Sequence, residues 1–191
     1  PLLKGSAGFS GQMSLKMESG APQVSARGRV RLKNGEVGNF VIGDLAGAIS
    51  LSRKGITFSD LDIHNADGVI SATGDLAFDD ALSLSADLKL TKVELAKLLE
   101  NVTLDNPFVM LKASGDINIR GALAPLSLKV STRLQVADHR VFDRSFHLPS
   151  RRTVLSVPAA IVAGRLSITG KALEARGMQV HSGDSSLAVD M

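Results

Sequence analysis

The stretch from Ala113 to Val136 reads ASGDINIRGALAPLSLKVSTRLQV, and its second half alternates apolar with polar residues. Thr132 interrupts an apolar row that otherwise takes every second position: Leu126, Leu128, Val130, Leu134 and Val136. The positions between them are polar: Ser127, Lys129, Ser131, Arg133 and Gln135. A period of two residues predicts a β-strand with one face buried and the other face in water.

The same alternation recurs along most of the chain. It is found in MSLKM, VSARGRVRL, AISL, ITFSDLDI, ISATGDLAF, LSLSADLKL, RLSI and SLAV. The segments KNGE, NADG and FDDA separate several of these runs, and such residues are typical of short hairpin turns. Short strands with tight turns between them predict an antiparallel meander of about a dozen strands with a strong twist.

One segment has a helical pattern instead. TKVELAKLLENV begins with Thr91, and Glu94 stands three residues later in a capping-box arrangement. The leucines and valine that follow have helical spacing: Leu95, Leu98, Leu99 and Val102. This pattern predicts a helical insertion over 91–103 that packs its leucines against the edge or mouth of the sheet.

Composition excludes several classes of protein. The chain has 191 residues, of which 44% are hydrophobic and 21% charged, so it can bury a core. It has no Cys, which excludes a disulfide scaffold and a thiolate metal site. Its 22 Lys and Arg against 19 Asp and Glu are too balanced for a surface that binds nucleic acid throughout, so we expect no nucleic-acid partner. No apolar run approaches the ~20 residues of a membrane helix.

The chain begins with Pro1 and ends in a strand-like run. We therefore expect it to be one segment, residues 1–191, of a longer protein built from repeats. Residues 46–73 and 163–190 align without a gap, with Gly47 over Gly164 and His64 over His181, and their apolar positions coincide. The repeated unit is about three strands long, which favours an architecture of stacked strands.

Catalytic motifs are not evident. The sequence has no phosphate-binding loop, dinucleotide-binding glycine pattern or nucleophile elbow. SGDSS (182–186) lacks the glycines expected after a nucleophilic serine, and it aligns with NADGV of the other copy, so we interpret it as a turn. The equivalent positions of His64 and His181 favour a structural role. No metal-ligand spacing fits the remaining cluster, which consists of Asp138, His139, Asp143 and His147. We expect no enzymatic activity, no cofactor and no metal.

The segment 138–161 is predicted to be a basic loop or linker. Four arginines alternate there with Phe142 and Phe146: Arg140, Arg144, Arg151 and Arg152. A solvated loop between two parts of the sheet is the simpler interpretation. The alternative is a contact for an anionic surface, such as lipid head groups or a partner protein.

The segments GDLAGAISLSRKGITFSDLDIHNADGVISATGDLAF (43–78) and SGDINIRGALAPLSLKVSTRL (114–134) resemble AsmA-like and TamB-like envelope proteins in glycine spacing and alternation. The resemblance implies a bridge-like lipid transfer protein of Gram-negative bacteria. It also implies a periplasmic location, with an inner-membrane anchor outside this segment. The fold then expected is all-β, with a long antiparallel sheet curled into a half-open barrel or β-taco groove and one short helix.

The function implied is the transport of phospholipid or another acyl lipid between the inner and outer membranes. An outer-membrane barrel is an expected partner through regions outside this segment, and no catalytic residues are implied. The expected lining of the groove is Ile49, Leu51, Ile70, Leu76, Phe78, Leu82, Leu84, Leu88, Leu90, Leu126, Leu128, Val130, Leu134, Val136, Leu166 and Ile168. The alternative is a structural or protein-interaction β-sandwich or solenoid module with a closed, dry core, since that core requires the same alternation.

Overall fold

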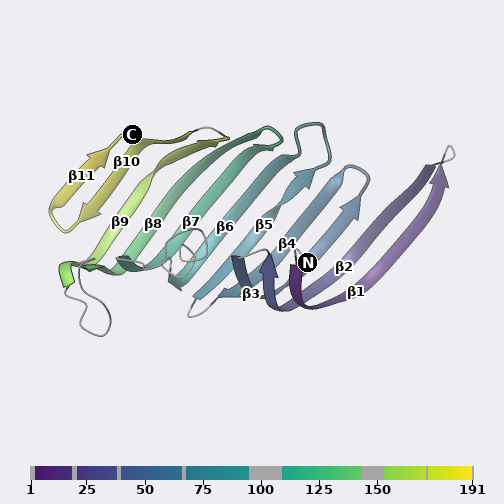
Figure 1. The fold of residues 1–191 in the computed structure, drawn as a ribbon, viewed down its shortest axis with the longest axis horizontal. Helices are drawn as coiled ribbons and strands as arrows, with labels where there is room; N and C mark the ends of the chain where they lie inside the picture. Colours follow the sequence, from purple (N-terminus) through teal and green to yellow (C-terminus); the bar gives the residue numbers. More distant parts are fainter. Residues whose placement is uncertain are drawn as a thin grey trace.

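The computed structural model describes residues 3–18, 21–37, 40–65, 68–94, 109–142, 153–170 and 172–190. Within these ranges the chain forms eleven β-strands in one antiparallel sheet and no helix. The strands lie side by side in the order of the sequence, from β1 to β11 (Figure 1). The all-β antiparallel meander predicted from the sequence is confirmed. No helix among the described residues is both long and apolar enough to cross a membrane.

The strands are long. Their bounds are β1 (Leu3–Glu18), β2 (Ala21–Val37), β3 (Phe40–Ser52), β4 (Gly55–Asn65), β5 (Gly68–Ala77), β6 (Ser83–Glu94), β7 (Val109–Leu123), β8 (Leu126–Phe142), β9 (Thr153–Thr169), β10 (Leu173–Ser182) and β11 (Ser185–Val189).

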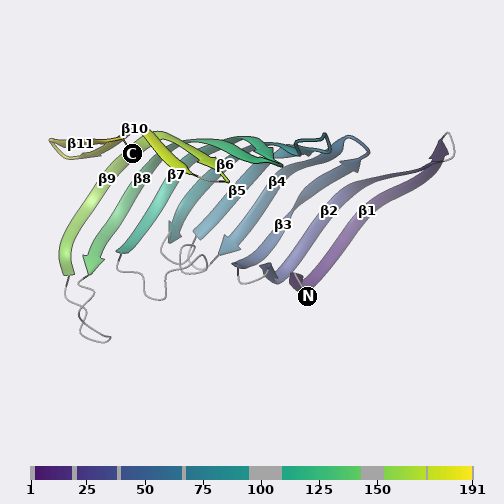
Figure 2. The same cartoon turned by 45° about the horizontal axis from the view of Figure 1, so that its top comes forward.

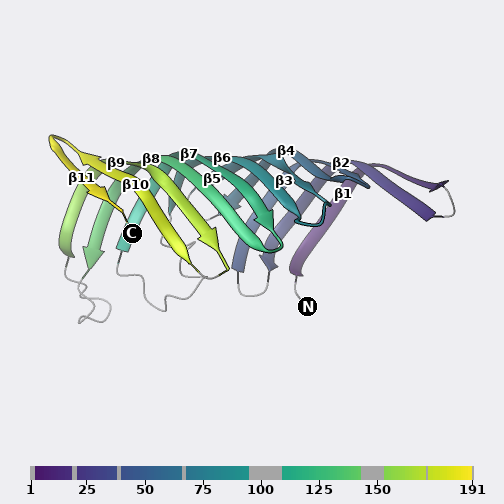
Figure 3. The ribbon, with the colours of Figure 1, turned by 90° about the horizontal axis from the view of Figure 1, so that it is seen from above.

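The sheet is open and strongly curved. β1 and β11 lie at its two ends and do not pair with each other, so the sheet does not close into a barrel. Figures 2 and 3 show that the long strands bend along their length, so that the sheet arches over instead of lying flat.

β-bulges account for part of this curvature. Asn34, Asp60, Lys92 and Gly177 each have a positive φ, and each lies where the register between two strands shifts. An inserted residue at a bulge bends its strand and increases the local twist.

The densest packing lies on one face of the central strands. Leu90, Val93, Ala113, Leu134 and Val136 form a buried cluster in which the exposed fractions range from 0% to 8%. Half-buried aliphatic side chains pack against this cluster: Ile70, Leu88, Ile117 and Val162. The core therefore forms from side chains of five neighbouring strands, β5 to β9.

The two copies of the sequence repeat form equivalent three-strand units, β3–β5 and β9–β11. In each copy a glycine lies against the next strand. A Cβ on Gly47 would lie 2.6 Å from Leu61 Cα, and one on Gly164 would lie 2.8 Å from Met178 Cα. The bulges beside them also match, because Asp60 and Gly177 have φ of 50° and 57°.

Three predictions of local structure need correction. KNGE is not a turn, because Lys33–Glu36 lies inside β2, where Asn34 occupies a bulge. The predicted helix does not begin at Thr91, since 91–94 complete β6, and the remainder of 91–103 lies outside the described residues. The predicted loop over 138–161 is too long, because β8 continues to Phe142 and β9 begins at Thr153.

Two other predicted turns lie among the described residues and are where the sequence predicts them, whereas the centre of NADG, 66–67, lies outside those residues. FDDA separates β5 from β6, and NADG spans the end of β4 and the start of β5. SGDSS forms the tight connection between β10 and β11, in which Ser182 pairs with Ser185.

Candidate functional site

The apolar residues of successive strands align into rows across one face of the sheet, which we call the apolar face. Directly paired residues of neighbouring strands point to the same side. One row, near the turns that follow β3, β5 and β7, runs Leu51, Ile56, Leu76, Leu84, Gly121, Leu128 and Ile168. A second row runs Ile49, Phe58, Gly74, Ala86, Ile119, Val130 and Leu166.

Further rows continue toward the other ends of the strands. One of them crosses nine strands through Leu45, Ile63, Ile70, Leu90, Gly115, Leu134, Val162, Val180 and Leu187. The aliphatic surface is therefore continuous across most of the sheet. The structure places the leucines of β6 and the apolar row of β8 on the same face, as the sequence predicts.

The predicted lining residues differ in exposure. Leu90, Leu134 and Val136 belong to the buried cluster. Ten others are half-buried: Ile49, Leu51, Ile70, Leu76, Leu84, Leu88, Leu128, Val130, Leu166 and Ile168. Phe78, Leu82 and Leu126 lie at or beside the turns, with 45%, 38% and 38% of their surface exposed. Phe78 and Leu82 do not belong to any strand, which corrects the strand runs predicted to contain them.

These turns form a linked rim along one end of the strands. The Phe78 amide donates to Lys54 O at 2.8 Å, the Leu123 amide to Ala81 O at 3.1 Å and the Gly170 amide to Leu126 O at 3.2 Å. Backbone hydrogen bonds therefore join one hairpin turn to the next. The rim exposes apolar side chains that include Leu123, of which 39% is exposed.

Asp79 stabilises the turn between β5 and β6. Its carboxylate accepts from the Ser83 hydroxyl at 2.7 Å and from the Ser83 amide at 2.9 Å. These two hydrogen bonds, the one from the hydroxyl having the larger effect, hold the pKa of Asp79 below the usual value of 3.8, because both favour the charged carboxylate.

Thr132 is the one polar residue in the apolar row of β8. It pairs with Ile117 on one side and Gly164 on the other. Its Oγ1 atom is buried and has no hydrogen-bond partner among the described residues. The apolar face therefore contains an unpaired hydroxyl near its centre.

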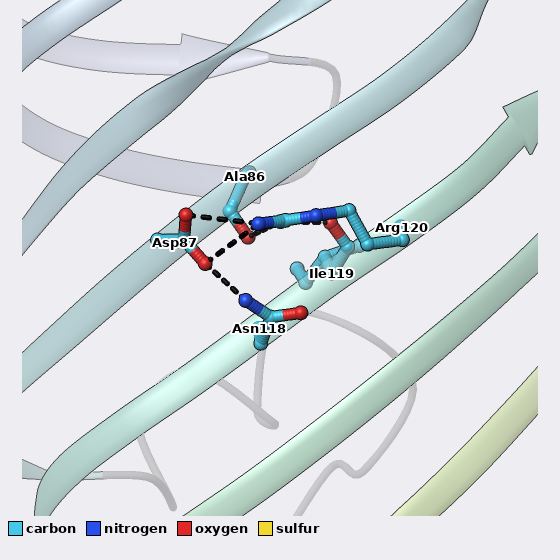
Figure 4. A network of polar contacts seen from close by, with 5 residues as sticks. All are labelled: Ala86, Asp87, Asn118, Ile119 and Arg120. Atoms are coloured by element: carbon cyan, nitrogen blue, oxygen red, sulfur yellow. Dashed lines mark hydrogen bonds and ion pairs between the residues drawn. The ribbon is translucent and has the colours of Figure 1, made fainter.

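The opposite face is polar. Asp87 accepts two hydrogen bonds from the Arg120 guanidinium, at 2.9 and 3.0 Å, and a third from the Asn118 amide (Figure 4). Arg120 also donates to Ala86 O at 2.8 Å and to Ile119 O at 2.8 Å. A hollow of about 640 Å³ lies on this face, and its walls include charged residues of β4, β6, β7 and β8. These charged side chains keep the polar face of the sheet in contact with water.

The apolar rows, as far as the structure describes them, consist of aliphatic residues, glycines, Phe58 and Thr132. Among the described residues no three His, Cys, Asp or Glu side chains lie close enough to hold a metal ion. His64 and His181 are exposed at equivalent ends of β4 and β10. Four arginines were predicted to contact an anionic surface. The structure describes only the backbone of Arg140, in β8, and Arg144, Arg151 and Arg152 lie outside the described residues.

Part of the apolar face was not predicted from the sequence. Ile117 and Ile119 of β7 contribute to it, and so do Val93 of β6 and Val162 of β9. In β7 the alternation continues through Gly115 and Gly121, whose missing side chains conceal the period of two. Treating glycine as compatible with an apolar row would have identified this strand's contribution.

No protein-family model matches this chain, and neither the curated proteins nor the solved structures compared with it include a significant match.

Proposed function

We propose that the apolar face is a lipid-carrying groove and that this chain is one segment of a protein moving phospholipid acyl chains between two membranes. The curved sheet is then a half-open β-taco, with aliphatic side chains inside and polar side chains outside. The observation that carries the proposal is the series of mainly aliphatic rows, which cross most of an open sheet. The AsmA-like and TamB-like resemblance supports the same interpretation.

The energetics of acyl transfer suit such a surface. Exposing an acyl chain to water costs ~0.8 kcal/mol per CH₂, so a sixteen-carbon chain costs on the order of 10 kcal/mol. A continuous aliphatic surface removes most of this cost at every point along the path. Aliphatic side chains that are half-buried in the free protein remain available for contact with a ligand, and they impose little geometric selectivity.

The buried cluster limits where lipid contacts the face. Leu90, Leu134 and Val136 are already packed, with at most 8% of their surface exposed. We therefore place the acyl chain on the half-buried rows nearer the rim, which include Leu84, Leu128 and Ile168. Leu134 is then part of the structural core and is not a contact residue.

The second candidate is a structural module whose apolar face is a closed core. The same buried cluster favours it, because this cluster packs without a ligand. In that case the half-buried rows would be covered by protein rather than by lipid. The two functions differ in whether lipid reaches Leu128.

Neighbouring positions on β8 provide a matched test. Leu128 and Lys129 are adjacent, so their side chains point to opposite faces. A photo-reactive amino acid replaces each in turn, and the full chain is irradiated with vesicles of phosphatidylethanolamine and phosphatidylglycerol. Mass spectrometry of the protein should detect lipid attached at Leu128 and not at Lys129. Equal labelling, or labelling at neither position, contradicts the proposal.

A charge substitution tests transport. Leu128→Glu places a carboxylate on the path of the acyl chain and should block lipid transfer between donor and acceptor vesicles, while Lys129→Glu should not. A buried charge also destabilises a closed core, so a melting curve accompanies each variant. A Leu128→Glu protein that melts normally and transfers no lipid supports the groove, and one that unfolds supports the dry core.

The remaining parts of the proposal follow the resemblance. We place the protein in the periplasm, anchored to the inner membrane by a segment outside residues 1–191, with an outer-membrane barrel as partner. The proposed activity is non-enzymatic and requires no cofactor.

A further inference from the structure

Four cations stand in a line along the polar face of β2. Arg27, Arg29, Arg31 and Lys33 occupy every second position of the strand, and all four are exposed. Alternate residues of a strand are ~6.7 Å apart, so the row is ~20 Å long. Like charges at this spacing repel one another, so the row does not contribute to the stability of the sheet.

The neighbouring strands do not neutralise this basic row. On β1 it pairs with Gln12, Ser10, Gly8 and Ser6. On β3 its three arginines pair with Ser50, Ala48 and Ala46. Both sets are uncharged.

No ion pair among the described residues involves any of the four cations. Arg120 on β7 is different, because Asp87 on the adjacent strand accepts both of its Nη2 hydrogen bonds (Figure 4). Asp44 lies opposite Lys33 and Asn34, where the register between β2 and β3 shifts, and it accepts from the Asn34 amide at 2.9 Å. Within the part of the chain that the structure describes, the guanidinium groups of the row have no acidic partner and face solvent.

Shallow hollows lie on both sides of the row. One, of about 450 Å³, has Arg27, Arg29, Ser50, Thr57 and Ser59 among its lining residues. The other, of about 320 Å³, lies on the β1 side and is lined by residues of Gly8–Ser10 together with Arg29 and Arg31. Among the described residues no carboxylate lines either hollow. Arg29 lines both hollows, with Arg27 in one and Arg31 in the other, so the three arginines border open space on the surface.

We propose that the basic row of β2 is a docking site for an extended acidic segment of a partner protein, with a carboxylate at every second residue. An extended peptide has the same ~6.7 Å spacing between alternate side chains as the row, so successive carboxylates meet successive cations. Arginine binds carboxylates through two parallel hydrogen bonds, which makes the match directional. This site lies on the face opposite the apolar rows, so it does not depend on the lipid-carrying function.

The surroundings disfavour the other polyanions. A bilayer is planar, and the carboxylates of Asp60, Asp62 and Asp75 stand on or near the same face in β4 and β5, where an anionic membrane would be repelled. Single-stranded nucleic acid gains much of its affinity from stacking on aromatic rings. The ring of Phe9 lies on the neighbouring strand β1, and its Cζ atom packs against Gly11 and Gly28 on the apolar face.

Peptide binding to the full chain tests the proposal. The probe is a fluorescent peptide of alternating Glu and Ser, about eight residues long, which spans the row when extended. Fluorescence anisotropy should show saturable binding that weakens as NaCl is raised, since these charges are exposed. A peptide of the same composition with its glutamates in one block should bind more weakly. Equal affinity for the two peptides overturns the proposed register.

Substitutions locate the site. Arg27→Gln, Arg29→Gln and Arg31→Gln together should weaken binding of the alternating peptide at least about tenfold, because three exposed charge-assisted contacts are lost. The matched control changes three cations of β8 and β9 that also face outward: Lys129→Gln, Arg133→Gln and Arg165→Gln. The control should bind as the wild type does. If both triple variants lost similar affinity for the alternating peptide, the binding would depend on net charge alone, and the proposal would be overturned.

The same assay identifies a different class of partner. A thymidine oligonucleotide and vesicles containing phosphatidylglycerol are titrated in place of the peptide. Tighter binding of either, lost in the β2 variant, would assign the row to nucleic acid or membrane and overturn the acidic-peptide proposal. Thermal melting of both triple variants confirms that each remains folded.

Discussion

Truncation of Leu90 should destabilise the protein much more than truncation of Leu128. Leu90 is 3% exposed and lies in the buried cluster. Leu90→Ala removes three carbons, which gives a transfer cost of ~2.4 kcal/mol, and the cavity left in a packed site brings the expected loss to about 3–4 kcal/mol. Leu128 is half-buried. The expected loss for Leu128→Ala is therefore about 1 kcal/mol.

Urea denaturation followed by circular dichroism at 218 nm, a wavelength typical of β-sheet, provides the measurement. The free energy of unfolding comes from the linear dependence on urea concentration, and the slope of that dependence must stay unchanged for the comparison to hold. Losses of equal size in the two variants would mean that the buried cluster is not a distinct core, and the assignment of Leu128 to the ligand-accessible rows would fail.

A double-mutant cycle sharpens the test. Leu90 and Leu134 face one another across Gly115, which has no side chain to separate them. Both belong to the same buried cluster. Leu90→Ala and Leu134→Ala should therefore be non-additive by at least ~0.5 kcal/mol, whereas Leu90→Ala and Leu128→Ala should be additive within that margin. Additivity in both pairs would contradict the packing described.

Three further predictions follow from single residues. Thr132→Val replaces the unpaired hydroxyl by a methyl group and should raise the free energy of unfolding by ~1 kcal/mol in the same urea assay; a loss of stability would show that the hydroxyl has a partner. Gly164→Ala should lower it by ~1–3 kcal/mol, because the new Cβ would meet Met178 backbone, whereas Gly170→Ala, with open space around it, should be tolerated. The pKa of Asp79 is lowered on folding by its Ser83 hydrogen bonds, so their stabilisation is present above pH ~3.8 and is lost as pH falls through the folded pKa. Asp79→Asn should therefore have a melting temperature that falls less steeply than that of the wild type below pH 4, and parallel acid limbs would refute this role.

Strand positions were predictable because the alternation is long and one face is apolar. Leu128, Val130 and Leu134 have the same period in the sequence as in the sheet, and the register follows from aligning such rows. The predicted turn at KNGE failed for a physical reason. Asn34 has φ of 50°, which suits a bulge as well as a turn, and only the pairing of β2 with both β1 and β3 distinguishes the two.

Thr91–Glu94 illustrates the same limit. A capping box is a local signal, but Val93 here enters the buried cluster beside Ala113, and that tertiary contact lies far away in the sequence. The residues of the candidate site were predictable from the sequence. The exposed fraction of each side chain was not. Whether a leucine is packed, half-buried or at the rim depends on how the sheet curves, and no single strand encodes that curvature. The basic row of β2 was visible as RGRVRLK, but its lack of ion pairs required the neighbouring strands.

The sequential order of the strands has a consequence for folding. Every extensive contact between the described strands joins two that follow one another along the chain. Most of these hairpins are local units, because few residues join their two strands, and their pairing does not wait for closure of a long loop. The pairs β6–β7 and β8–β9 have longer connections and should form later. Folding can begin at any hairpin and spread in both directions, and unfolding should begin at the ends. Amide hydrogen exchange should therefore be slowest in β6 to β8, which contribute most of the buried cluster, and should quicken stepwise toward β1 and β11. A chain of this kind can gain or lose whole hairpins at its ends without changing the register of the strands that remain.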